Sequence, residues 1–147
     1  MTDAAPTLAT ALEAEHRELD ELLGFFLAAA SGEDAGAAGR AMEEFDERLR
    51  EHTRREEERL YTRLPGRKLL PAETEEEEEK LSRELRLEHV QIREVSGMMR
   101  RMLGEKKDVA SALALAGNLA RRWEAHTVRE ESEVFPAFGQ EVDDREA

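Results

Sequence analysis

Two short stretches of the chain repeat a histidine followed, one helical turn later, by a glutamate. The first, "HTRREE", places His52 before Glu56, and the second, "HTVREE", places His126 before Glu130. Imidazole nitrogens and carboxylate oxygens are ligands that iron, manganese and zinc accept in proteins. The chain has no cysteine, which excludes thiolate ligation, disulfides and thiol catalysis. The pattern therefore points to a metal site made from nitrogen and oxygen donors.

The other two histidines, His16 and His89, lie in segments that also match each other. These segments are "EAEHRELDELL" and "LRLEHVQIREV". The chain has only four histidines, and each of these two comes before one of the repeated pairs. The sequence therefore predicts two copies of one helix pair.

Long amphipathic segments separated by short polar or glycine-rich stretches must position these side chains. The 147 residues are 39% charged, 39% hydrophobic and 5% aromatic, a composition that favours helices with solvated outer faces. We expect one domain over residues 1–147, all-α, folded as an up-down-up-down four-helix bundle of two pseudo-symmetric helix pairs. Thr74 and Asp108 are expected to cap helices. The connections are expected at residues 31–39 and 66–73, and the helices at about 7–30, 40–64, 74–103 and 109–138.

Each of the four histidines lies in the apolar stripe of its own expected helix. The stripes are Leu12, His16, Leu19 and Leu23; Leu49, His52, Glu56 and Leu60; Leu85, His89, Ile92 and Met99; and Leu119, Trp123, His126, Glu130 and Val134. The histidines and two of the glutamates are therefore predicted to face inward, whereas Arg54 and Arg55 are predicted to face water.

A single inward histidine is usually a core residue with a hydrogen-bond partner. A buried carboxylate, however, is destabilising by several kcal/mol unless it is paired or bound to metal. The four histidines also fall within about a turn and a half of one layer of the bundle. Two imidazoles for each of two ions, with bridging carboxylates, match the di-iron or di-manganese sites of four-helix bundles. The predicted ligands are His16, His52, Glu56, His89, His126 and Glu130.

In the order and spacing of these ligands, the chain resembles the hemerythrin-like (HHE cation-binding) family. The matching features are single histidines at His16 and His89, each followed by an HxxxE pair, "HTRRE" and "HTVRE". The resemblance runs from His16 to about Phe138. It implies a non-heme centre of two iron ions, in preference to manganese or zinc, bridged by Glu56, Glu130 and an exchangeable oxo or hydroxo group.

The ligand set differs from that of the oxygen-carrying hemerythrins, which use a fifth histidine. Leu85 and Arg93 stand at the positions four residues before and after His89. The symmetric set of four histidines and two glutamates is similar instead to that of the iron-sulfur-cluster repair (RIC) di-iron proteins. Those proteins also carry a cysteine-bearing domain, and the absence of cysteine here argues against repair activity.

Several other polar or aromatic residues lie close to the predicted ligands. Glu15 and Glu88 each precede a histidine and either orient it or face solvent. Asp20 is expected to pair at the surface, with a role as a further ligand or a hydrogen-bond acceptor as the alternative. Tyr61 and Trp123 are expected to pack in the core, with a redox or gating role for the Tyr61 hydroxyl as the alternative.

The charge of the chain limits its expected partners. With 35 acidic against 22 basic residues, the net charge is -13, which disfavours nucleic acid and anionic membranes. No segment approaches the roughly 20 apolar residues of a membrane span, and no secretory signal is apparent, so a cytoplasmic location is expected.

The expected function is that of a di-iron protein that binds or reduces dioxygen, nitric oxide or peroxide. Iron storage, donation or sensing without turnover is the alternative, and a zinc-stabilised structural bundle is a third. The sequence leaves the oligomeric state and the physiological small molecule open.

Overall fold

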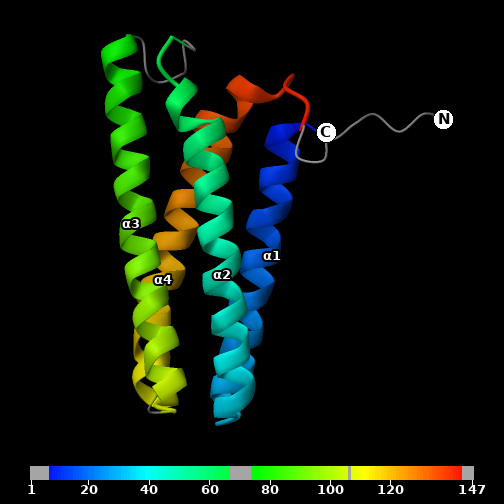
Figure 1. Cartoon of the computed structure of the whole chain (residues 1–147), viewed down its shortest axis with the longest axis vertical. Coiled ribbons are helices and arrows are strands. Elements are labelled where there is room, and N and C mark those ends of the chain that lie inside the picture. Colours follow the sequence, from blue (N-terminus) through cyan, green and yellow to red (C-terminus); the bar gives the residue numbers. More distant parts are fainter. Residues whose placement is uncertain (1–6, 67–73, 106, 144–147) are drawn as a thin grey trace, which may run out of the picture.

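Four long helices, each antiparallel to the next, make up most of the chain in the computed structural model, which describes residues 7–66, 74–105 and 107–143 (Figure 1). α1 packs against α2, α2 against α3, α3 against α4, and α4 back against α1. The predicted all-α bundle of consecutive antiparallel pairs is therefore confirmed. The elements are α1 (Leu8–Ser31), α2 (Ala35–Arg59), η1 (Tyr61–Arg63), α3 (Glu75–Glu105), α4 (Val109–Arg129), η2 (Glu130–Val134) and η3 (Phe135–Phe138).

Side-chain caps fix where the helices begin. As predicted, the Thr74 hydroxyl accepts a hydrogen bond from the Glu77 amide, and Asp108 accepts one from the amide of Ser111. The expected start of the second helix, at residue 40, was too late. Asp34 caps this helix, because its side chain accepts a hydrogen bond from the amide of Ala37. The alanines that follow are strong helix formers. The predicted linker at 31–39 thus shrinks to a short turn, and the predicted connection over 67–73 lies outside the described residues.

The far ends of the second and fourth helices also differ from the prediction. The α-helical part of α2 stops at Arg59 and continues as the single 3₁₀ turn η1, rather than reaching residue 64. α4 stops at Arg129 and widens into η2, a turn of π-helix, before the 3₁₀ turn η3. Pro136 explains part of this change, because its ring has no amide hydrogen and clashes with the carbonyl four residues earlier.

The buried apolar side chains form two clusters, one on each side of the histidine layer. One cluster lies toward the α1–α2 and α3–α4 turns and includes Leu19, Leu49, Ile92 and Trp123. The other lies toward the opposite end of the bundle, where α1 begins and η3 lies (Figure 1). Its members are Leu8, Ala9, Leu12, Leu60, Tyr61, Leu64, Leu81, Leu85, Val134, Phe135 and Phe138. On each helix, the predicted ligands lie between residues of one cluster and residues of the other. Apolar side chains therefore cover the histidine layer on both sides.

No helix in the described part of the chain has an apolar stretch long enough to span a bilayer.

Candidate metal centre

All six predicted ligands meet in this layer. α1 contributes His16, α2 contributes His52 and Glu56, and α3 contributes His89. His126 lies in the last turn of α4, and Glu130 is the first residue of η2. None of the six is more than 2% exposed, so whatever compensates their polarity must lie inside the bundle.

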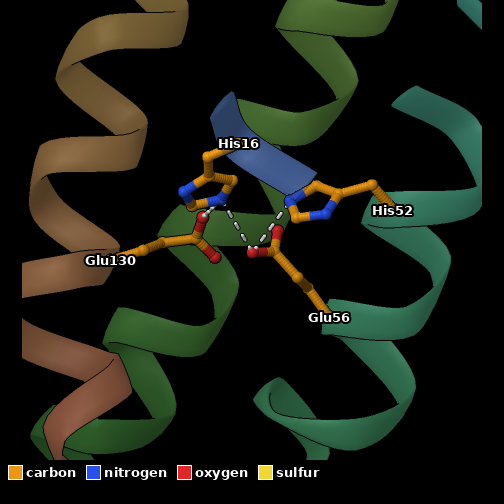
Figure 2. Close-up of side chains that lie close together, drawn as sticks. All are labelled: His16, His52, Glu56 and Glu130. Atoms are coloured by element: carbon orange, nitrogen blue, oxygen red, sulfur yellow. Dashed lines mark hydrogen bonds and ion pairs between the residues drawn. The ribbon is translucent and has the colours of Figure 1, made fainter. Parts of the chain in front are cut away.

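One half of the centre is formed by His16 and His52, which face both glutamates across the bundle (Figure 2). The Nε2 atom of His16 lies 3.2 Å from Glu56 Oε2 and 3.2 Å from Glu130 Oε1. The Nε2 atom of His52 lies 3.0 Å from the same Glu56 oxygen. Four donor atoms from three different helices thus face a common point.

The other half is formed by the second pair of histidines with the same two glutamates. His89 Nε2 lies 2.9 Å from Glu56 Oε1, and His126 Nε2 lies 3.0 Å from Glu130 Oε1. Within each half, the four donor atoms all lie within 4.8 Å of one another. Because both carboxylates belong to both halves, the two groups overlap as the two positions of a binuclear site would.

The donor spacing fits bound ions. Two ligands at right angles on one ion, each about 2.1 Å away, lie about 3.0 Å apart, which matches the nitrogen–oxygen distances above. Two buried donor atoms, His52 Nε2 and Glu130 Oε1, also make no hydrogen bond within the described structure. Buried polar atoms of this kind call for a partner, and a cation between the carboxylates and the imidazoles would supply it.

A carboxylate holds the outer nitrogen of every histidine. The Nδ1 distances are 3.0 Å from His16 to Glu131, 2.7 Å from His52 to Glu15, 2.8 Å from His89 to Glu57, and 2.7 Å from His126 to Glu88. A neutral imidazole that donates from Nδ1 must present its Nε2 lone pair inward, so these carboxylates select the tautomer that binds metal.

Sequence reasoning found only part of this outer ring. Glu15 and Glu88 do orient histidines, but each orients the histidine of the neighbouring helix rather than the one beside it in sequence. Glu57 and Glu131 were missed, although the repeated "REE" at 55–57 and 129–131 was a signal that both glutamates of each pair matter. The missing information was the rotation of one helix against the next.

Arg55 is buried, so the prediction that it faces water was wrong. Its guanidinium donates one hydrogen bond to Glu15 and another, of 3.1 Å, to Asp143. Arg55 therefore ties the residue that orients His52 to the segment after η3. Arg54 is exposed, as predicted, and pairs with acids on its own helix.

The aromatic residues lie against the histidines. Trp123 is buried beside the site, as expected, with its ring centroid 5.3 Å from that of His16, and its indole nitrogen donates to Asp20 at 2.7 Å. Asp20 is thus a hydrogen-bond acceptor rather than a metal ligand. Tyr61 is buried among core residues, as predicted, but its hydroxyl points into the centre and donates to Glu130.

Opposing effects set the charges in the centre. Burial lowers the pKa of His16, but contacts with Glu130 and Glu56 outweigh burial and raise it to about 10. Burial raises the pKa of Glu56, but the charge of His52 and hydrogen bonds from the histidines outweigh that and hold it well below its usual range. Without metal, a proton on His16 therefore compensates part of the charge of the two buried carboxylates at neutral pH.

Removing one outer carboxylate should weaken the ion on its own side. Glu57→Ala should lower affinity for the ion between His89 and His126 by roughly 10- to 100-fold, because the imidazole loses its fixed tautomer. Competition with a chelator measures this change. Glu131→Ala should lower affinity for the other ion in the same way, through His16. Glu58→Ala is the matched control for Glu57→Ala, because Glu58 lies on the exposed face of α2. An equal loss of affinity in the control would refute the orienting role.

Comparison with known proteins agrees with this geometry. A sequence profile for the hemerythrin HHE cation-binding domain matches residues 7–138, a range that includes every residue of the two donor groups. No curated protein and no solved structure shows significant similarity to the chain.

Proposed function

The chain belongs to the hemerythrin family of HHE cation-binding domains, and on that premise we propose that it is a di-iron protein that binds or reduces a small molecule such as dioxygen, nitric oxide or peroxide. The observation that carries the proposal is the overlap of two buried His₂Glu₂ groups on the same two carboxylates. A single-ion site would not need both oxygens of Glu56 to face different histidine pairs.

The donor set is one that suits iron, as it also suits manganese. Imidazole and carboxylate donors without thiolate suit iron, manganese or zinc, and two carboxylates shared by two ions in a helical bundle are typical of di-iron and di-manganese centres. When bound, a pair of irons would supply electrons to a small molecule. The chain's own contribution would be to hold the carboxylates and imidazoles in place and to exclude bulk water through the two apolar clusters.

The surroundings favour a small partner. The ligands are almost fully buried, so no large substrate could reach them without opening the bundle. A surface hollow of about 220 Å³ lies over one side of the centre, where its lining includes His52, Glu15, Leu19 and Arg55. A diatomic molecule or peroxide that entered from this hollow would have to pass the His52 ring.

Rapid mixing tests the proposal. The protein loaded with ferrous iron should react with dioxygen, nitric oxide or peroxide faster than free ferrous iron in the same buffer, and the change should be visible in its optical spectrum. Protein that holds two irons but reacts with none of the three would contradict the proposal. That result would favour the alternative of iron storage, donation or sensing.

A further inference from the structure

One position of the internal repeat places a different aromatic side chain beside each half of the centre. Tyr61 follows the first HxxxE pair at the same spacing at which Phe135 follows the second. Both rings are buried against a histidine, with centroids 5.1 Å apart for Tyr61 and His89 and 5.3 Å apart for Phe135 and His16. The hydroxyl group of Tyr61 is therefore the main chemical difference between these two rings.

That hydroxyl lies among the donor atoms of one half only. Its oxygen is 3.0 Å from His89 Nε2 and 3.5 Å from His126 Nε2, and it donates a hydrogen bond to Glu130 Oε2. The side chain is 1% exposed, so no solvent accounts for its direction. Tyr61 is also the only tyrosine of the chain.

We propose that Tyr61 is a further protein ligand, through its oxygen, to the ion held between His89 and His126. This inference rests on the proposed di-iron function. Its support is geometric, because the spacing of 3.0 Å between the phenol oxygen and His89 Nε2 is about that of neighbouring ligands on one ion. Tyrosine oxygen is an established ligand for iron in proteins. On coordination, an oxygen–metal bond replaces the O–H bond, and the proton passes to solvent.

The two ions would then be unequal, which differs from what the symmetric His/Glu set alone implies. The ion between His89 and His126 would have one more protein ligand than its neighbour. The ion between His16 and His52, which faces the apolar ring of Phe135, would be the one that accepts the small molecule. The surface hollow beside His52 lies on this same half.

The test is the spectrum of the ferric protein, because a phenolate bound to iron(III) gives a visible charge-transfer band. We expect the wild type to show this band, with phenolate ring vibrations in the resonance Raman spectrum excited in it. Tyr61→Phe should lose both signals and still bind two irons. Phe135→Leu, which alters the equivalent ring on the other half, should keep them.

Elemental analysis separates the possible failures. Wild-type protein with two irons and no phenolate vibrations would overturn the role of Tyr61 without touching the di-iron proposal, and this result does not depend on whether any variant folds. If iron did not bind, the proposed function would fail. Gallium(III), which is similar in charge and size to iron(III), would then test whether Tyr61 is a ligand. A metal-bound phenolate gives an ultraviolet difference spectrum, and gallium-loaded protein without that spectrum would overturn the inference.

Discussion

Replacing Glu56 with alanine is expected to remove both metal ions. One oxygen of this carboxylate lies 3.0 Å from His52 Nε2 and 3.2 Å from His16 Nε2, while the other lies 2.9 Å from His89 Nε2. No other side chain but Glu130 belongs to both donor groups. Loss of Glu56 therefore takes a ligand from each ion and leaves the buried imidazoles with only one of their two shared carboxylates.

Metal content by elemental analysis measures this effect, and His52→Ala provides a graded comparison. His52 belongs to one donor group only, so its removal should release the ion beside His16 and weaken the other less. Glu51→Ala, at an exposed position of α2, should retain both ions. A Glu56→Ala protein that kept one tightly bound ion would show that the carboxylate serves a single position and would contradict a shared bridge.

Metal affinity is expected to rise steeply with pH, from neutral to about pH 10. Without metal, the contacts of His16 with Glu130 and Glu56, despite its burial, raise its pKa to about 10, and the pKa of His126 is likewise raised despite burial, chiefly by the charge of Glu130. Coordination requires neutral imidazole, so each ion must displace protons. Well below its pKa, each displaced proton makes the apparent affinity rise about tenfold per pH unit, which gives roughly 500-fold between pH 7 and pH 10 for His16 alone.

Chelator competition at a series of pH values, under anaerobic conditions, measures this slope. Affinity that stays flat from pH 7 to pH 9 would mean that the imidazoles are already neutral and would contradict the account. Stability without metal should change in the opposite direction. The contribution of the raised His16 pKa is fully present below about pH 6.5 and is lost as pH rises through about 10.

The ligands could be predicted from the sequence because each lies in a single helical stripe. The position of His16 between Leu12 and Leu19 requires no knowledge of any other helix. The histidine–carboxylate pairs on Nδ1 could not be predicted in the same way, since Glu15 contacts the histidine of another helix and Arg55 is buried by a contact far along the chain. Both depend on how neighbouring helices rotate and slide against each other, which spacing within one helix does not fix.

The helix ends show the same limit. The α-helical series that predicted Glu130 and Val134 to face inward was right about their burial, although the backbone there is π-helical rather than α-helical. Tyr61 was predicted to be a core residue from its apolar neighbours, and it is buried. The direction of its hydroxyl depends on the 3₁₀ turn that ends the second helix, and side-chain periodicity contains no signal for that turn.

The most direct test of the central claim is the number and identity of metal ions in the purified protein after expression with ample iron. Elemental analysis should give two irons per chain, because two buried donor groups share Glu56 and Glu130. One metal ion per chain, or zinc alone despite the available iron, would contradict a di-iron centre.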